Sequence, residues 1–196
     1  KITKNVDRLD HAFFANILTR HPTGVHVLSS PAHLNGHIRP TPEIMSHLLD
    51  LMKGTFDFVV IDGGQSTDDT TLRIVELSDT LLLIIILSLP CLANSNKLIQ
   101  SFIELGFLNN DQIKVVANRH VKNSEISPSD AKAGIGKNLF WIIPNDYRTT
   151  MSAINQGKAV CELAARSEMS KSLQGLADAL FPAEKQTEKR KWKLFG

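Results

Sequence analysis

The side chains in this sequence best suited to chemistry are carboxylates and amides that follow apolar, β-rich runs. Asp62 ends the run FDFVVID and is followed by a glycine turn, Gly63-Gly64. A carboxylate in that position can hold Mg²⁺, directly or through water, beside a nucleotide phosphate. An aspartate before glycine can equally cap its own turn, so the motif by itself leaves both interpretations open.

Two other apolar runs end in polar groups of a different kind. IKVVAN ends in Asn118, which is followed by Arg119, and LFWIIP ends in Pro144, which is followed by Asn145 and Asp146. Amide and carboxylate groups at strand ends can bind the polar edge of a base through hydrogen bonds. Asn, Pro and Asp also favour turns for backbone reasons, so ordinary turn formation is the alternative.

The segment AKAGIGKN, residues 131–138, resembles a phosphate-binding loop only in part. That motif reads G-x-x-x-x-G-K-[ST], follows a strand and opens a helix. Here Ala131 replaces the first glycine, Asn138 replaces the hydroxyl residue, and the segment runs from a helix start, SPSDAK, into the strand-like LFWIIP. We therefore interpret Gly134 and Gly136 as helix-stop and turn glycines.

The elements that position these groups alternate between β-rich and amphipathic runs. This alternation predicts an α/β fold, with a doubly wound, mainly parallel sheet and helices on both faces. Ligands of such sheets bind beyond the carboxyl ends of the strands, where the polar groups described above occur. A final helix is expected over about residues 167–180. The predicted strands cover residues 25–30, 56–62, 80–88, 113–118 and 139–144.

Composition fits a globular α/β domain and argues against several other classes. Of the 196 residues, 42% are hydrophobic and 21% charged, and the net charge of +2 is too small to indicate a nucleic-acid partner. The longest apolar run, LLLIIILSL, has about half the length of a membrane span. Cys91 and Cys161 lack metal-ligand spacing and are expected to be reduced thiols. No G-x-G-x-x-G follows a strand, which argues against a dehydrogenase.

Taken in order, the segments resemble a known family. FDFVVIDGGQS, LLLIIILSLP, IKVVANR and FWIIPNDYRTTMSAINQGKAV together resemble the ParA/MinD group of deviant Walker ATPases. Within that group the sequence is most similar to the TadZ/CpaE-type pilus assembly ATPases. The most specific part is IPNDYRTTMSAINQGKAV followed by a final helix, and the resemblance covers about residues 9–180.

The resemblance implies an ATP-dependent, dimerising switch that localises a Flp/Tad-type pilus assembly machine. The implied location is the cytoplasm, or the inner face of the membrane or a cell pole as a peripheral protein. ATP and Mg²⁺ are the implied cofactors, and a second copy and pilus assembly proteins are the implied partners. DNA is not expected, because no basic cluster occurs outside the tail.

The resemblance also implies roles for individual residues. Asp62 would be the catalytic carboxylate that orients Mg²⁺ and water near the γ-phosphate, contacting the metal through water. Asn118 would contact adenine at the strand end. The residues implied to surround the base are Asn118, Arg119, Pro144, Asn145 and Asp146.

The family's defining segment does not occur in this sequence. A strand, the loop K-G-G-x-G-K-[ST] and a further strand ending in Asp would precede the residues matched here. We therefore interpret residues 1–182 as an N-terminally incomplete ATPase domain, and expect unpaired backbone edges where the central strand is missing. We also expect weak or no ATP binding, because phosphate and Mg²⁺ contacts supply much of a nucleotide site's interaction. Gly63-Gly64 replaces the family's usual Thr-Pro, and the alternative function is a degenerate, non-hydrolysing scaffold.

Residues 183–196 form a basic, aromatic tail. In EKRKWKLFG, the side chains of Trp192, Leu194 and Phe195 alternate with Lys and Arg. Such a segment can settle on an anionic membrane surface, and it resembles the C-terminal membrane-targeting helix of MinD-type proteins. A solvated tail is the alternative, because isolated helices of this length are marginal in water.

Overall fold

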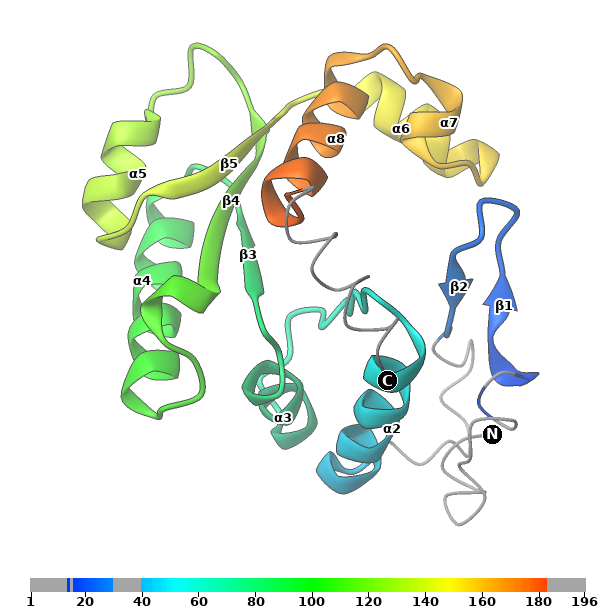
Figure 1. Ribbon diagram of the computed structural model, residues 1–196. Helices are drawn as coiled ribbons and strands as arrows, with labels where there is room; N and C mark the ends of the chain where they lie inside the picture. Colours follow the sequence, from blue (N-terminus) through cyan, green and yellow to red (C-terminus); the bar gives the residue numbers. More distant parts are fainter. Residues whose placement is uncertain (1–13, 15, 30–39, 183–196) are drawn as a thin grey trace. The chain divides into compact units, whose positions relative to one another are not determined.

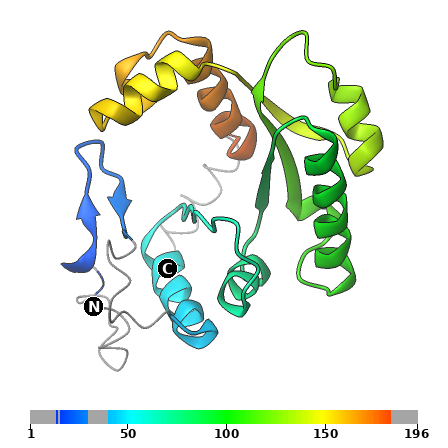
Figure 2. The ribbon, with the colours of Figure 1, turned by 180° about the vertical axis from the view of Figure 1, so that it is seen from behind.

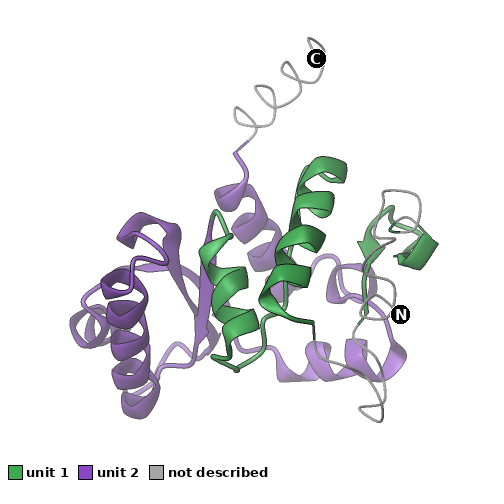
Figure 3. Ribbon diagram, turned by 90° about the horizontal axis from the view of Figure 1, so that it is seen from below, with its two compact units in different colours: residues 1–79 green, residues 80–196 purple. Residues whose placement is uncertain are grey.

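The computed structural model describes residues 14, 16–29 and 40–182. Backbone contacts divide the chain into two compact units, residues 1–79 and 80–196, which Figure 3 colours separately. The proposed boundary between a domain of residues 1–182 and a tail of residues 183–196 stays a prediction. The tail, with Trp192, Leu194 and Phe195, lies outside the described residues.

Unit 2 is built on a parallel sheet of three strands in the order β3-β4-β5. The strands are β3 (Leu81–Ile85), β4 (Ile113–His120) and β5 (Leu139–Pro144). They confirm the strands predicted over residues 80–88, 113–118 and 139–144. Val115, Val116 and Ala117 in the middle of β4 have 0% exposure, as expected for a central strand that is apolar on both faces.

Helices cover both faces of this sheet (Figures 1 and 2). Two of them, α4 (Leu89–Glu104) and α5 (Pro128–Ile135), lie on one face, and α8 (Glu168–Leu180) lies on the other. A hydrophobic cluster that joins Val116 and Ile143 of the sheet to Met169 and Leu176 packs α8 against β4 and β5. This arrangement confirms the predicted doubly wound, mainly parallel α/β class. The short elements of unit 2 are η3 (Asn110–Gln112), α6 (Tyr147–Gln156) and α7 (Val160–Leu163).

Local signals set the ends of α5 largely as the sequence predicts. The Ser127 side chain accepts a hydrogen bond from the N–H of Asp130, and Pro128 occupies the first turn. Gly136 ends the helix with φ of 75°, a left-handed conformation that favours glycine. Gly134 lies inside α5, so its interpretation as a stop or turn glycine is wrong. A helix tolerates an interior glycine at a cost of about 1 kcal/mol, so the cap at Ser127 and the stop at Gly136 decide its extent.

Unit 1 contains the helices α2 (Pro42–Thr55) and α3 (Asp69–Glu76) and a small antiparallel sheet. That sheet pairs β1 (Thr19–Arg20) with β2 (His26–Val27). The prediction of a parallel-sheet strand over residues 25–30 is therefore wrong. Gly24 has φ of 92° in a tight turn that is closed by a hydrogen bond from the Gly24 N–H to the His21 carbonyl. This turn brings β2 back alongside β1 in an antiparallel pair.

The strand predicted over residues 56–62 does not form in the described structure. These residues adopt no regular strand, and Val60 is 87% exposed. A strand forms only where a neighbouring strand pairs with its N–H and C=O groups, and neither of the two described sheets includes this segment.

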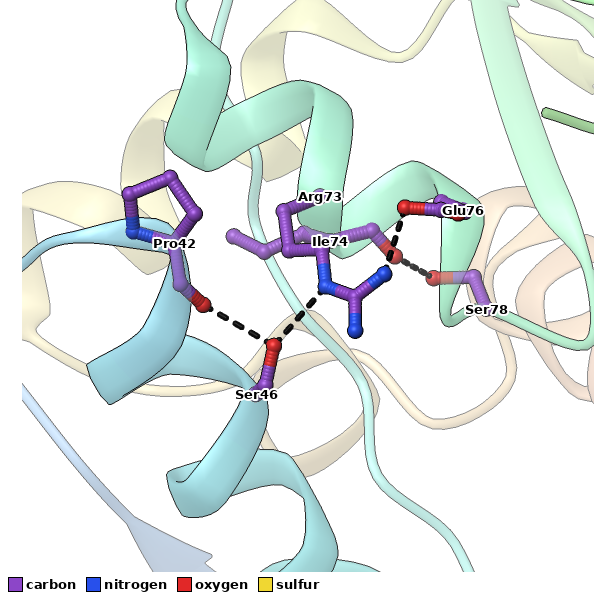
Figure 4. A network of polar contacts seen from close by, with 6 residues as sticks. All are labelled: Pro42, Ser46, Arg73, Ile74, Glu76 and Ser78. Atoms are coloured by element: carbon purple, nitrogen blue, oxygen red, sulfur yellow. Dashed lines mark hydrogen bonds and ion pairs between the residues drawn. The ribbon is translucent and has the colours of Figure 1, made fainter.

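A polar network joins α2 to α3 within unit 1 (Figure 4). The Ser46 hydroxyl donates to the Pro42 carbonyl at 2.9 Å and accepts from Nε of Arg73 at 2.8 Å. The guanidinium of Arg73 also pairs with the Glu76 carboxylate at 2.6 Å. Ser46 therefore acts as both donor and acceptor between the two helices.

Other predictions from composition can be compared with the described residues. Cys91 and Cys161 are free thiols. Across residues 40–182 and the shorter described stretches before them, we find no helix with the length and apolarity needed to cross a membrane.

Candidate functional site

The residues predicted to surround the base lie together at the carboxyl ends of β4 and β5. Asn118 and Arg119 are the two residues before the last residue of β4, and Pro144 is the last residue of β5. His120 lies opposite Pro144 in the parallel register. We call residues 118–120 and 144–146 the carboxyl edge. It lies where sheets of this class bind their ligands.

A backbone hydrogen bond ties the two halves of the carboxyl edge together. The N–H of Asn145 donates to the carbonyl of His120 at 2.9 Å. This bond continues the pairing of β4 and β5 one residue past the end of β5. It holds the polar residues that follow the two strands beside one another.

Arg119 has an unusual backbone conformation. Its φ is 54°, and it is the one non-glycine residue with positive φ among the residues that the structure describes. Such a conformation costs about 1–2 kcal/mol for a residue with a Cβ atom. The Asn118 side chain partly offsets this cost, because its Oδ1 accepts from the N–H of Arg119 at 2.8 Å. Backbone strain of this kind clusters at ligand sites, so it marks the carboxyl edge as a candidate.

Asp146 has a structural role that the sequence left open. Its Oδ1 accepts from the N–H of Thr149 at 3.1 Å, and its carbonyl accepts from the Thr150 hydroxyl at 2.7 Å. Asp146 is therefore the N-cap of α6, which confirms the turn-forming interpretation. An ionised carboxylate has about four acceptor positions, so the cap leaves acceptor capacity for a ligand.

The sequence reasoning missed His120. Its Nδ1 is buried and has no hydrogen-bond partner among the described residues. A buried polar atom left without a partner costs about 1–3 kcal/mol, and it calls for a water or ligand group. The one sequence signal was the position of His120 directly after Asn118 and Arg119.

Asp62 lies in unit 1. Its Oδ1 accepts from the N–H of Gly64 at 3.1 Å, and Gly64 has φ of 63°. Asp62 is thus a turn-capping residue, and its side chain is exposed. Among the residues with described positions, no group of three or more His, Cys, Asp or Glu could hold a metal ion. The catalytic and Mg²⁺-binding roles of Asp62 stay predictions.

AKAGIGKN forms the second half of α5, its stop and the residues that lead to β5. Lys137 donates from Nζ to the carbonyl and side-chain oxygens of Asn110, at 2.6 and 2.9 Å. The interpretation of this segment as a helix-to-strand connection is confirmed.

Comparisons with solved structures establish the fold. No family model matches the sequence, and no curated protein sequence matches it. A ParA family ATPase from Chlorobium tepidum TLS is similar with a TM-score of 0.82 and 24% identity, over 92% of this chain and 74% of that one. MinD from Pyrococcus horikoshii OT3 complexed with Mg-ADP has a TM-score of 0.59 and 20% identity, over 72% and 55%. The MinC:MinD complex of Aquifex aeolicus has a TM-score of 0.66 and 15% identity, over 81% and 64%.

The chain therefore has the doubly wound α/β fold of the ParA and MinD ATPases. Identities of 24% or less carry the likeness no further than the fold. The chain spans 55% of the MinD from P. horikoshii and 64% of the chain from A. aeolicus. The similarity to TadZ/CpaE-type pilus assembly ATPases stays a prediction from sequence.

Proposed function

We propose that this protein is a nucleotide-dependent switch of the ParA/MinD type, and that its carboxyl edge binds adenine. The observation that carries the proposal is the placement of Asn118 and Arg119 beside Asn145, joined through the Asn145–His120 hydrogen bond of 2.9 Å. An amide can donate to and accept from the edge of a base, and a carboxylate can accept from the exocyclic amino group of adenine. Asp146 supplies such a carboxylate.

This sequence offers few residues that would bind the phosphates of a nucleotide. The 196 residues contain no G-x-x-x-x-G-K-[ST]. When bound, Mg²⁺ would neutralise charge on the phosphates. Asp62 is the residue proposed to hold it, through water. We expect adenosine and ATP to bind this chain with similar and weak affinity, because the base supplies most of the contacts. Sub-micromolar ATP binding by this chain would contradict that expectation.

The sequence resemblance is the basis for a role in pilus assembly and for membrane contact. The resemblance to TadZ/CpaE-type ATPases supports a switch that localises a Flp/Tad-type pilus assembly machine, as a homodimer with pilus assembly partners. The tail supports peripheral contact with the inner face of the membrane through Trp192, Leu194 and Phe195. Vesicle co-sedimentation with and without residues 188–196 tests that contact, and equal binding by both forms would exclude it.

The base site can be tested residue by residue. Adenosine is added to isotope-labelled protein, and the amide shifts of Asn118, Arg119 and Asn145 are followed by NMR. Asn118→Ala should weaken adenosine binding by about tenfold, because one hydrogen bond to the base is lost. Asn138→Ala is the matched control, since Asn138 is an exposed asparagine just before the amino end of β5. Equal shifts with cytidine, or shifts centred elsewhere, would contradict the proposal.

A non-hydrolysing scaffold is the second candidate function. It is favoured by Gly63-Gly64 after Asp62, where the resemblance implies Thr-Pro. Calorimetry with Mg-ATP and Mg-ADP on the native full-length polypeptide, beside this chain, separates the two functions. Binding by the full-length polypeptide supports the switch. Binding by neither supports the scaffold and leaves Asp62, Asn118 and Asp146 as fold-stabilising residues.

A further inference from the structure

A pocket lies at the end of unit 2 opposite to the carboxyl edge. It has a volume of about 500 Å³ and is formed by η3, the amino ends of β4 and β5 and the last turn of α5. Lys114 is the second residue of β4 and His120 the last. At about 3.3 Å per residue, the six steps between them span roughly 20 Å. The pocket is therefore distinct from the proposed base site.

Three lysines line this pocket. Its charged lining residues are Lys114, Lys132, Lys137 and Asp111. Asp111 is the one carboxylate among them. In the described part of the chain the ammonium group of Lys132 has neither an ion-pair nor a hydrogen-bond partner. The backbone carbonyl of Lys132 accepts from the N–H of Gly136 at the end of α5. The pocket thus holds more positive charge than its own residues neutralise.

Local contacts hold two of these charges in place. Burial lowers the pKa of Lys137 from its usual 10.5, and the nearby Lys114 lowers it further, while Asp111 acts in the opposite direction. Nζ of Lys137 is fixed by two hydrogen bonds to Asn110. Nζ of Lys114 lies 4.5 Å from the centroid of the Phe140 ring. These contacts place the ammonium groups of Lys137 and Lys114 against residues that line the pocket.

We propose that this pocket binds a small phosphorylated anion. Lysine binds phosphate as a point charge, and the three lysines of the lining supply three such charges. The volume falls within the roughly 300–1,000 Å³ typical of small-molecule sites. Asp111 and the carboxyl end of α5, which carries about half a negative charge, reduce the field of the three lysines without cancelling it.

Calorimetry with inorganic pyrophosphate and the 196-residue chain, at constant ionic strength, tests the proposal. Lys132→Gln should weaken pyrophosphate binding by about tenfold, because the pocket loses its unpartnered ammonium group. Lys171→Gln on α8 removes the same charge at another exposed site and should leave the affinity within about twofold. Asn118→Ala should also leave it unchanged, which separates this pocket from the proposed base site.

A second readout follows Lys137 itself. The pKa of its ammonium group, measured by NMR of the Cε resonance, should rise when pyrophosphate is added, because a nearby anion favours the charged form. Three results would each overturn the proposal. One is no saturable binding with a Kd below about 1 mM. Another is an equal loss of pyrophosphate affinity in Lys132→Gln and Lys171→Gln. The third is a loss of pyrophosphate affinity in Asn118→Ala with no loss in Lys132→Gln.

Discussion

Gly175 and Trp141 leave no room for a side chain between them, because a Cβ atom on Gly175 would lie 2.8 Å from Cζ2 of the indole ring. The indole Nε1 of Trp141 also donates to the hydroxyl of Ser172 at 3.0 Å. Gly175 and Ser172 both belong to α8, and Trp141 belongs to β5. The missing side chain at position 175 therefore lets α8 approach the sheet over the indole ring.

We predict that Gly175→Ala destabilises the protein by about 1–2 kcal/mol. The added methyl group overlaps a ring that is fixed by its hydrogen bond, and overpacking of this kind costs about 1–3 kcal/mol. The higher helix propensity of alanine offsets up to about 1 kcal/mol of that cost. Urea unfolding should show a lower midpoint with an unchanged m-value.

Gly134→Ala is the matched control for this substitution. Gly134 is also an interior helix glycine, but its Cβ atom would lie 3.5 Å from Cδ1 of Leu92, an ordinary van der Waals contact. We expect the change to stabilise the protein by up to about 1 kcal/mol through helix propensity alone. If both substitutions stabilised the protein, the close contact between Gly175 and Trp141 would be contradicted.

A second prediction concerns the network of Figure 4. Ser46→Ala removes both hydrogen bonds of the Ser46 hydroxyl and should destabilise the α2–α3 pair by about 1 kcal/mol, because Nε of half-buried Arg73 loses its acceptor. Glu76→Gln removes only an exposed ion pair and should cost less than about 0.5 kcal/mol. Amide hydrogen exchange within α2 and α3 measures both. A larger effect for Glu76→Gln would contradict the central role of Ser46.

The features that the sequence predicted best are apolar strands and the ends of helices, because both depend on residues close together in the chain. Apolar runs predicted β3, β4 and β5, and the central strand β4 is buried on both faces. The final helix was predicted to begin near residue 167, and the Ser167 side chain accepts a hydrogen bond from the N–H of Ser170 in the first turn of α8. The carboxyl edge followed from the strand order, since polar residues after parallel strands meet at one edge.

The failures concern pairing between distant segments. Residues 56–62 include five apolar residues, but a strand also needs a partner backbone, which composition does not reveal. The burial of His120 Nδ1 and the presence of Lys114, Lys132 and Lys137 in the lining of one pocket depend on how separate elements pack. Sequence spacing therefore gave no signal for the lysine pocket.

A third prediction concerns the strained backbone at the carboxyl edge. Arg119→Val should destabilise the protein by about 1–2 kcal/mol, because a β-branched residue fits poorly at φ of 54°. Arg119→Asn removes the same guanidinium but should be tolerated, since asparagine adopts this region more readily. Thermal or urea unfolding distinguishes the two variants. Equal destabilisation would indicate that the Arg119 side chain, rather than its backbone, matters for stability.

The last prediction concerns the acid dependence of the α5 cap. The hydroxyl of Ser127 donates to the Asp130 carboxylate at 2.6 Å, and the N–H of Ser127 donates to it at 2.9 Å. These bonds, the hydroxyl first, lower the pKa of Asp130 below its usual 3.8. A carboxyl group with a lowered pKa in the folded state contributes stability above pH 3.8, and loses it as the pH falls through the folded-state pKa.

Ser127→Ala should therefore raise the pKa of Asp130 towards 3.8, measured by NMR titration of its carboxyl carbon. The stability difference between the natural sequence and Asp130→Asn should stay constant at neutral pH and shrink in acid, once the carboxyl group protonates in both states. Ser129→Ala is the control, because Ser129 contacts the Ser127 hydroxyl at 2.7 Å without being a donor to the carboxylate. It should move the pKa of Asp130 less than Ser127→Ala does. An unchanged pKa in Ser127→Ala would mean that the charge of Asp130 is stabilised by the helix end rather than by the cap.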